Sequence, residues 1–426
     1  MRSTFAALRV RNYRLFAGGS LVSNVGTWMQ RVAQDWLVLA LTGSAGALGI
    51  TTGLQFLPLL LFSPIAGVIA DRYPKRKVLA VTQVALAATA AVLGLLAVTG
   101  LVTVWHVYIL AFVFGAAAAF DTPARQAFVN DMVEPDQLAN AVGLNSASFN
   151  LGRVIGPAVA GLLIAWLGSG VTATGWVILL NAASYLAVIV SLARIVEDEL
   201  TPPTPVPRAR GQLRDGLRYV RARPDLMLVM AVVFSAGTFG LNFQMTTALM
   251  ATEVYGKGAG EYGILGSVLA IGSLGGSLLA ARRAETRQRL VIGAAIAFGA
   301  AEVVAGTMPT YLTFALFLPL CGFTALTMIT AANAFVQMSV APQMRGRVMA
   351  LYMAIFMGGT PVGAPVLGWV AEHFGARWTL VGGGALTIVG TLIATAAFAH
   401  HQEVELHPRV LFAGIGHAGR VPGDRT

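Results

Sequence analysis

The sequence predicts an all-α membrane protein with twelve transmembrane helices in two pseudo-symmetric six-helix bundles. Three observations support this prediction: the composition, the placement of the positive charges and an internal repeat. Of 426 residues, 56% are hydrophobic and only 11% are charged, whereas about a quarter of the residues in a soluble domain are charged. The apolar runs are continuous and lack the alternation of barrel strands, so helices must satisfy the backbone within the bilayer.

A helix needs roughly 20 predominantly apolar residues to cross the hydrocarbon. Short polar segments separate the apolar runs, and the first run is too long for a signal peptide and contains Arg31 and Asp35. The expected spans are 15–40, 46–70, 78–99, 104–121, 140–166, 174–193, 225–250, 260–281, 290–307, 311–337, 347–370 and 376–399.

The Lys and Arg residues follow these spans in a regular way. Of 29, 25 fall in the N-terminal tail, the even-to-odd helix connections and the C-terminal tail; two lie within spans, Arg31 and Arg153, and two lie in the other connections, Lys257 and Arg377. This is the positive-inside bias. It predicts a multi-pass protein of the inner cell membrane with both termini in the cytoplasm. It also explains the net charge of +10 by contact with the lipid bilayer, without nucleic acid binding.

Residues 194–224 interrupt the hydrophobic pattern with an acidic start, a Pro-rich run and a basic end. They predict a cytoplasmic linker between an N-terminal bundle (1–193) and a C-terminal bundle (225–399), followed by a cytoplasmic tail (400–426). Leu213, Leu217 and Val220 alternate with arginines at helical spacing, which favours a basic amphipathic helix on the cytoplasmic face. A solvated basic loop is the alternative.

An ungapped offset of 207 residues relates the two halves, as repeated halves of secondary transporters require. The offset places glycines and a proline in register. The matched positions are Ala127, Phe128, Val129, Val133, Pro135, Ala147, Phe149, Gly152, Gly156 and Gly161, which pair with Ala334, Phe335, Val336, Val340, Pro342, Ala354, Phe356, Gly359, Gly363 and Gly368.

Residues 67–77 read GVIADRYPKRK and resemble the loop between helices 2 and 3 of the major facilitator superfamily, Gly-x-Leu-Ala-Asp-Arg-x-Gly-Arg-Arg. The sequence departs from that pattern at Ile69, Pro74 and Lys75. The resemblance implies a cytoplasmic gating motif formed by Gly67, Asp71, Arg72 and Lys75. An ordinary basic loop is the alternative interpretation.

Residues 152–161 read GRVIGPAVAG. They resemble the antiporter motif of the same superfamily, Gly-x-x-x-Gly-Pro-x-x-Gly-Gly, in Gly152, Gly156, Pro157 and Gly161, with Ala160 as the one departure. Glycines four apart permit close helix packing, and proline removes one backbone hydrogen bond. A generic packing face explains the glycines but not the proline. The resemblance implies export.

Residues 29–36 and 120–129 make the chain similar to the enterobactin-exporter-like secretion family, which is related to macrolide efflux proteins. By this resemblance Asp121, at the cytoplasmic end of helix 4, would face Arg72 and Lys75. The arginine that many drug antiporters carry within helix 4 is absent, and Ala111 stands near its place.

Polar residues recur every three to four positions along the first span, so they form one stripe that we expect to face a cavity. Asn24, Thr27 and Gln34 belong to this stripe, and Asn242 and Thr246 belong to a weaker stripe in the seventh span. These five residues are candidates for lining a common pathway. Buried contacts between helices are the alternative.

Four charged residues fall within the expected spans: Arg31, Asp35, Arg153 and Glu302. Such charges cost roughly 2.5–3.5 kcal/mol each on insertion scales, and they are functional candidates. Arg31 or Arg153 is the expected partner of Asp35, and exchange of that partner for a proton would couple charge to conformation. Glu302 and Asp121 are further proton-coupling candidates; for Glu302 a structural role is equally open.

The sequence contains no phosphate-binding loop of the Walker type, no His or Cys cluster with metal spacing and no intramembrane catalytic pair. We therefore expect no cofactor, no metal and no enzyme activity. The expected function is secondary active export of a small amphipathic molecule, such as a drug, an antibiotic or a siderophore, by proton antiport in a monomer. The alternatives are a proton-coupled uptake symporter and a non-transporting membrane receptor.

Overall fold

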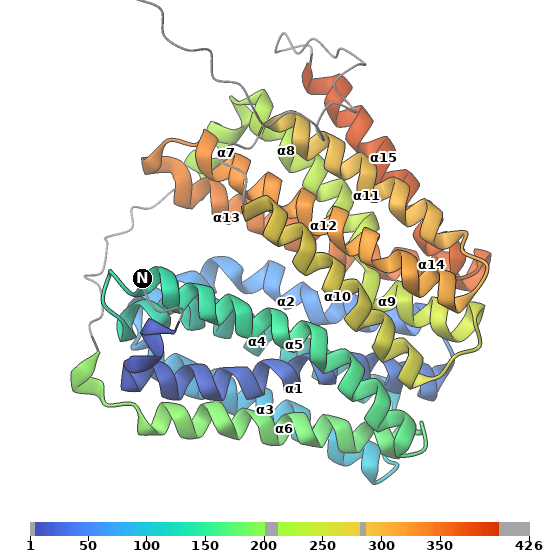
Figure 1. Ribbon diagram of the computed structural model, residues 1–426, viewed down its shortest axis with the longest axis horizontal. Helices are drawn as coiled ribbons and strands as arrows, with labels where there is room; N and C mark the ends of the chain where they lie inside the picture. The colour runs from blue at the N-terminus through green and yellow to red at the C-terminus, as the bar shows by residue number, and fades with distance from the viewer. Residues whose placement is uncertain (1–4, 201–211, 282–286, 400–426) are drawn as a thin grey trace, which may run out of the picture.

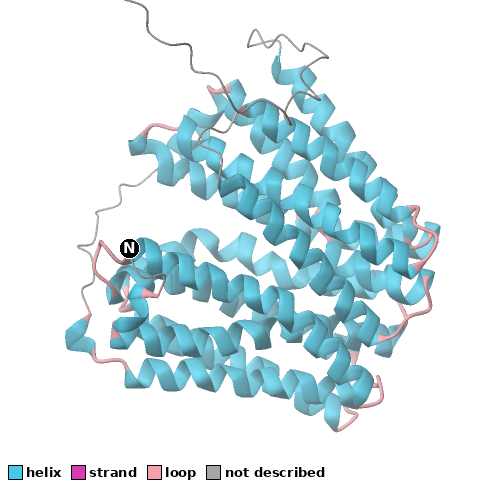
Figure 2. Ribbon diagram, viewed as in Figure 1, coloured by secondary structure: helices cyan, strands magenta, loops and turns pink. Residues whose placement is uncertain are grey.

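The computed structural model describes residues 5–200, 212–281 and 287–399. Within these ranges every regular element is a helix (Figure 2). The expected C-terminal tail, the Pro-rich part of the linker and the side chain of Asp71 lie outside the described part of the chain.

The N-terminal half contains six long helices after a short one, η1. Their bounds are η1 (Ala6–Arg9), α1 (Arg11–Thr42), α2 (Ala45–Arg72), α3 (Lys75–Val98), α4 (Val104–Met132), α5 (Leu138–Trp166) and α6 (Val171–Arg194). The linker holds η2 (Glu197–Glu199) and α7 (Gln212–Arg221).

The C-terminal half repeats the six-span arrangement with more interruptions. Its elements are α8 (Pro224–Ser235), η3 (Ala236–Gly240), α9 (Phe243–Leu249), η4 (Met250–Val254), α10 (Ala259–Ala281), α11 (Gln288–Gly306), α12 (Tyr311–Ser339), α13 (Pro342–Gly358), α14 (Thr360–Phe374) and α15 (Arg377–Ala399). The two halves lie one above the other in Figure 1, which confirms the two-bundle architecture.

Eleven helical segments of the described residues are long and apolar enough to cross a membrane. The remaining long helix is α1, with 32 residues. Its polar stripe lowers its mean hydropathy, but α1 packs along both α5 and α6, so those polar side chains lie among other helices. The structure therefore confirms eleven of the expected spans, and α1 lies where the remaining one is expected.

Two expected spans are not continuous α-helices. The span expected at 225–250 consists of α8, η3, α9 and η4, of which η3 and η4 are π-helical, and the span expected at 347–370 is divided between α13 and α14. The π segment loosens backbone pairing, and side chains compensate: Thr238 donates to the carbonyl oxygen of Phe234 at 2.7 Å, and Asn242 donates to that of Thr238 at 2.9 Å. Such π-helical segments are frequent at functional sites.

Equivalent glycines pack equivalent helices together in the two halves. A Cβ on Gly156 would lie 2.9 Å from the carbonyl oxygen of Val25 in α1, and a Cβ on its repeat partner, Gly363, would overlap the carbonyl oxygen of Thr238 in η3. The fifth and eleventh spans thus approach the first and seventh spans in the same way. The offset of 207 residues therefore describes a repeat of structure as well as of sequence.

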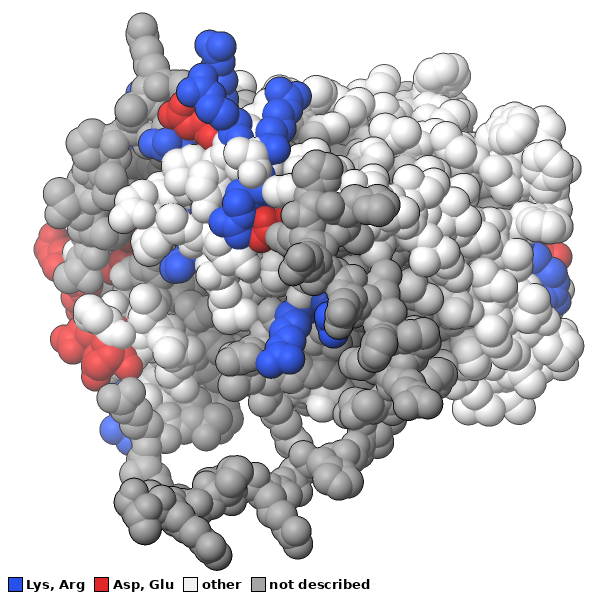
Figure 3. All heavy atoms as spheres, turned by 90° about the horizontal axis from the view of Figure 1, so that it is seen from above, with Lys and Arg blue, Asp and Glu red and all other residues white. Residues whose placement is uncertain are grey.

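The molecule has two chemically different ends. One end, which we call the basic end, carries residues 73–74, residues 133–137 and α7. The opposite end, which we call the distal end, carries residues 43–44, 99–103, 167–170 and 255–258. On the face that Figure 3 shows, most of the charged side chains gather at the basic end, a few lie at the distal end, and the surface between is uncharged. This uncharged belt is what a lipid bilayer requires.

The two halves approach each other most closely toward the distal end, and their ribbons diverge toward the basic end (Figure 1). α5 packs on α10, and α2 packs on α14. Small residues make this possible: a Cβ on Gly161 would lie 2.4 Å from the carbonyl oxygen of Ala259, and one on Gly263 would lie 2.2 Å from that of Pro157. A Cβ on Gly49 would lie 2.4 Å from the carbonyl oxygen of Ala364.

We expect Gly263→Ala to separate α5 from α10, because the added methyl group meets rigid backbone. Overpacking of this kind costs about 1–3 kcal/mol, and the apparent unfolding temperature of the purified protein should fall. Gly260→Ala is the matched control on the same helix, since a Cβ there lies 3.5 Å from the Cβ of Ala165. Equal unfolding temperatures for the two variants would contradict the close packing described here.

Candidate functional site

Asp35 joins the two halves of the molecule. Its side chain is buried in α1, with 1% of its surface exposed. The Oδ2 atom accepts hydrogen bonds from Nε2 of Gln244 in α9 and from the hydroxyl of Tyr262 in α10, both at 2.7 Å. Both donors belong to the C-terminal half. A buried carboxylate therefore holds the halves together on the distal side of the molecule.

The expectation that Asp35 pairs with an arginine is wrong for this conformation. Among the described side chains, neither Arg31 nor Arg153 forms an ion pair with Asp35. Arg31 stands one turn before Asp35, and its guanidinium turns instead toward the rings of Trp28 and Phe56, 4.6 and 5.6 Å from their centroids. Neutral donors from the other half occupy the place that was expected for a cation.

The guanidinium of Arg153 also lies over Trp28, 5.8 Å from the ring centroid. Trp28 thus has two cationic neighbours, one from its own helix and one from α5. Phe149 of α5 meets the same tryptophan edge-on, with ring centroids 5.6 Å apart. We call Arg31, Arg153, Trp28, Phe56 and Phe149 the cation–aromatic cluster.

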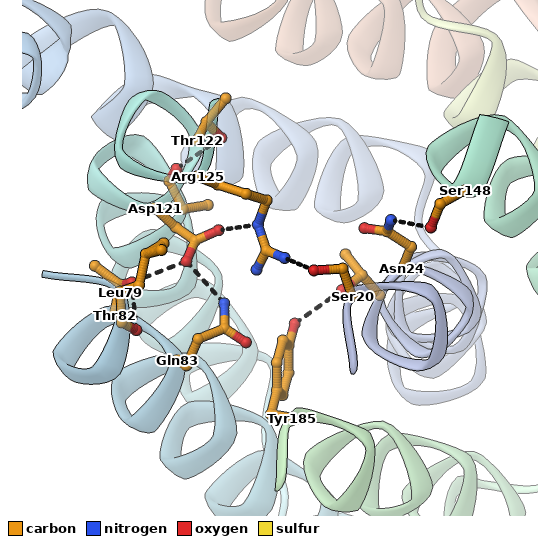
Figure 4. Close-up of polar contacts among 12 residues, drawn as sticks. Ser20, Asn24, Leu79, Thr82, Gln83, Asp121, Thr122, Arg125, Ser148 and Tyr185 are labelled. Atoms are coloured by element: carbon orange, nitrogen blue, oxygen red, sulfur yellow. Dashed lines mark hydrogen bonds and ion pairs between the residues drawn. The ribbon is translucent and has the colours of Figure 1, made fainter. Parts of the chain in front are cut away.

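The polar stripe of α1 mostly ties helices together, which was the alternative interpretation of this pattern. Asn24 donates to Ser148 at 3.0 Å, Thr27 shares a hydrogen bond with Tyr185 at 3.1 Å, and Gln34 donates to Gln55 at 3.3 Å. Figure 4 shows the contact between Asn24 and Ser148, and Tyr185 beside α1. Membrane helices use such polar side chains as interhelical contacts.

The candidates of the seventh span are buried as well. Asn242 and Thr246 are 3% and 2% exposed. Asn242 donates to the carbonyl oxygen of Thr238 and Thr246 to that of Phe243. The prediction that these two residues line an open pathway does not hold in this conformation, because their donors serve the interrupted helix.

Asp121 contacts α3 and its own helix, and does not face Lys75 as expected. It accepts hydrogen bonds from Thr82 at 2.8 Å and Gln83 at 2.7 Å, and forms an ion pair with Arg125 at 3.0 Å (Figure 4). Arg125 in turn donates to Ser20 of α1 at 3.0 Å. This buried network holds α1, α3 and α4 together.

The acid that contacts the basic loop is Asp131, the penultimate residue of α4. Lys75 donates to both of its carboxylate oxygens, at 3.0 and 2.9 Å. The loop also reaches the linker: Arg76 forms an ion pair with Glu197 and donates to the carbonyl oxygen of Leu192 at 2.8 Å. Asp131 takes the place that was expected for Asp121 because α4 extends to Met132, eleven residues beyond Asp121. This length brings Asp131 to the level of the loop.

Glu302 lies inside the C-terminal half, 1% exposed on α11. Its Oε2 atom has no hydrogen-bond partner among the described residues. The surrounding backbone is close, since a Cβ on Gly240 would lie 2.7 Å from Oε2 and one on Gly384 2.9 Å from the Cβ of Glu302. Unlike Asp35, Glu302 contacts only its own half.

The residues that resemble the antiporter motif, 152–161 in α5, pack against two different helices. Gly152 and Gly156 pack against α1, whereas Pro157 and Gly161 pack against α10. The backbone N–H of Ala158 donates to Ser267 of α10 at 3.1 Å, which gives the helix a polar contact to the other half beside the proline. The motif therefore forms part of the distal contact between the halves.

At the distal end, Glu372 of α14 links that helix to the start of α2. Its Oε1 accepts hydrogen bonds from the Ser44 hydroxyl and, at 3.0 Å, from the backbone N–H of Gly46, at the first turn of α2. The favourable field of a helix N-terminus adds to this contact.

Sequence reasoning missed Gln244, Tyr262, Ser267 and Glu372. Gln244 carried a signal, as an amide in an apolar run. Tyr262 and Ser267 carried none, because their role depends on which helices of the two halves face each other. In the described part of the chain no group of three or more His, Cys, Asp or Glu residues is placed to hold a metal ion.

Comparisons with known proteins agree with this architecture. The model of the transmembrane secretion effector family matches residues 2–414. The chain is 25% identical to macrolide efflux protein A of Streptococcus pyogenes over 88% of this chain and 93% of that protein. It is 29% identical to the multidrug efflux pump Tap of Mycolicibacterium fortuitum over 90% and 93%. A staphyloferrin A transporter of Staphylococcus aureus matches at 32% identity over 36% of this chain and 38% of that protein.

Solved structures show the same fold at low sequence identity. A bacterial homologue of the human lysosomal transporter Spinster, in an inward-facing and unoccupied conformation, superposes with a TM-score of 0.69 at 17% identity and covers 91% of this chain and 96% of that chain. A D-xylose–proton symporter gives a TM-score of 0.69 at 14% identity over 92% and 97%. With the family match across nearly its whole length, the chain belongs to the transmembrane secretion effector family of major facilitator transporters.

Proposed function

We propose that this protein is a secondary active exporter of a small amphipathic molecule, driven by proton antiport through alternating access. The observation that carries the proposal is the Asp35 bridge, in which a buried carboxylate of one half accepts hydrogen bonds from Gln244 and Tyr262 of the other. The relatives support export, because two of them are named for efflux of macrolides and of multiple drugs.

We infer the orientation from the charges. The basic end faces the cytoplasm of an inner membrane, with both termini on that side, because cytoplasmic loops carry the excess of Lys and Arg. The distal end then faces outward. Close contact at the distal end together with divergence toward the basic end (Figure 1) corresponds to an inward-facing state. The transporter acts as a monomer in which the two halves rock about the site between them.

The Asp35 bridge supplies a way to couple protons to this motion. Hydrogen bonds to a charged group are worth about 1.5–3 kcal/mol each, so Gln244 and Tyr262 stabilise the ionised carboxylate while the distal end is closed. When the distal end opens, α1 separates from α9 and α10 and Asp35 loses both donors. Protonation from the outside then removes the buried charge. Closing restores the donors, and the proton leaves toward the cytoplasm.

Transport into inverted vesicles tests the proposal, because the cytoplasmic face of the protein is then on the outside. A panel of macrolides, cationic drugs and catechol siderophores is offered with an acidic vesicle interior. An antiporter accumulates its substrate inside the vesicle. An uptake symporter moves substrate out of preloaded vesicles under the same gradient, and a receptor moves none; either result would rule out the proposed export.

Replacing each buried acid by its amide distinguishes the role of Asp35 from that of Glu302. We expect Asp35→Asn to abolish accumulation driven by the pH gradient, because the amide carries no proton through the cycle. Counterflow, which needs no net proton movement, should persist and shows that the variant is folded. Glu302→Gln is the matched control, since it replaces an equally buried acid that contacts only one half. Full gradient-driven accumulation by Asp35→Asn would refute the assignment.

Removal of one donor should weaken closure of the distal end. Tyr262→Phe deletes a hydrogen bond to Asp35, and the loss of about 1.5–3 kcal/mol should increase the open fraction by at least roughly tenfold. The measurement is the rate at which a membrane-impermeant maleimide, added from the outside, modifies a cysteine placed at Gly260, which faces Ala165 across the halves.

Tyr352→Phe is the control for this experiment. Tyr352 is as buried as Tyr262, at 1% exposure, but its hydroxyl bonds to the carbonyl oxygen of Ile329 within the same half. Equal modification rates in the two variants would show that the Tyr262 hydroxyl does not hold the distal end closed.

A further inference from the structure

The cation–aromatic cluster holds two positive charges that no acid of the described residues meets in an ion pair; Asp35, one turn from Arg31 on α1, acts on that arginine only from a greater distance. Within the described part of the chain, the guanidinium groups of Arg31 and Arg153 form no ion pair and no side-chain hydrogen bond, and Nε of Arg31 is buried without a partner. Their contacts are with aromatic rings: both lie over Trp28, at 4.6 and 5.8 Å. Cation–π contacts of this kind orient a guanidinium but leave its N–H donors free.

The nearby acids are engaged elsewhere. Asp35 accepts its hydrogen bonds from Gln244 and Tyr262, and Asp121 accepts from Thr82, Gln83 and Arg125. Asp35 offsets part of the charge of Arg31, but among the described residues no acid acts on Arg153, so the cluster keeps a positive charge in the interior of a membrane protein. Because guanidinium forks match carboxylates and similar oxyanions, the missing partner has the chemistry of an organic acid.

The aromatic rings of the cluster indicate what the rest of the ligand looks like. Trp28 and Phe56 are half-buried and Phe149 is 48% exposed, so part of their aromatic surface is uncovered beside the two guanidinium groups. A ligand that used this surface would present an apolar or aromatic body together with an acidic group. The charges disfavour a cationic drug, which two arginines would repel.

We propose that Arg31 and Arg153 form the anion-binding part of the substrate site, and that the transported molecule is an amphipathic organic anion. This inference rests on the proposed transport function and names its substrate class. The acidic group lies between the two guanidinium groups and its ring system packs against Trp28 and Phe149. The arginines are thus specificity-determining residues, distinct from Asp35, which carries the proton.

Binding of three probes that share a naphthalene ring and differ in charge tests the proposal on the full chain in lipid nanodiscs. The probes are 2-naphthoate, 2-naphthamide and 2-naphthylmethylammonium, and calorimetry measures each dissociation constant. Charge-assisted hydrogen bonds predict that the acid binds at least roughly tenfold more tightly than the amide. Arg31→Gln and Arg153→Gln should remove this preference by weakening the binding of 2-naphthoate more than that of 2-naphthamide. Tighter binding of the ammonium probe, or unchanged naphthoate affinity in both variants, would overturn the proposal.

Two further variants serve as controls for folding and for nonspecific charge effects. Arg153→Lys keeps the charge without the fork and should retain a reduced preference for the acid, which shows that a loss in Arg153→Gln is not misfolding. Arg345→Gln removes one charge from an exposed position on α13 and should leave all three affinities unchanged. If the acid is not preferred while the wild-type protein still exports under a pH gradient, the anion site fails and the antiport proposal stands. If the acid is preferred but no substrate moves, the reverse holds.

Discussion

A carboxylate inside a membrane protein is costly unless hydrogen-bond donors surround it, and Asp35 finds its donors on the opposite half of the molecule. Gln244 and Tyr262 both donate to one of its oxygens at 2.7 Å. Two hydrogen bonds that join α1 to α9 and α10 therefore end on a single carboxylate. A motion that separates the halves at the distal end must first replace these two hydrogen bonds.

The bridge depends in turn on how closely the halves pack. Gly161 and Gly263 let α5 and α10 meet through their backbones, and Gly49 does the same for α2 and α14. Larger side chains at these positions would hold Tyr262 away from Asp35. The helix 5 motif thus shares in the charge chemistry although it carries no charge, because it sets the distance across which the carboxylate is satisfied.

Much of this architecture was predictable from the sequence, since it follows from one-dimensional patterns. Apolar runs, the placement of arginines and glycines in register at an offset of 207 define twelve spans and two halves. Partners of individual charges were not predictable. Arg31 precedes Asp35 by one turn, yet its guanidinium stacks on Trp28. Asp131, and not Asp121, meets Lys75, because α4 continues beyond its apolar stretch. Such choices depend on side-chain directions and helix lengths, which spacing alone does not determine.

The proposed proton site, Asp35, and Arg31 of the cation–aromatic cluster lie on the same helix. Asp35 and Arg31 lie one turn apart on α1, so a rotation or tilt of this helix changes the surroundings of both. An anion bound between Arg31 and Arg153 would neutralise charge beside Asp35, and the electrostatic interaction between the two sites links substrate occupancy to protonation.

Distances between spin labels at the distal ends of α2 and α14, measured as a function of pH, test this account most directly. With an ionisable Asp35, raising the pH should shift the wild-type distribution toward the short distance of the closed distal end. Asp35→Asn should show a distribution that does not change with pH. A pH-dependent shift of equal size in Asp35→Asn would contradict the claim that this carboxylate couples protonation to the motion of the halves.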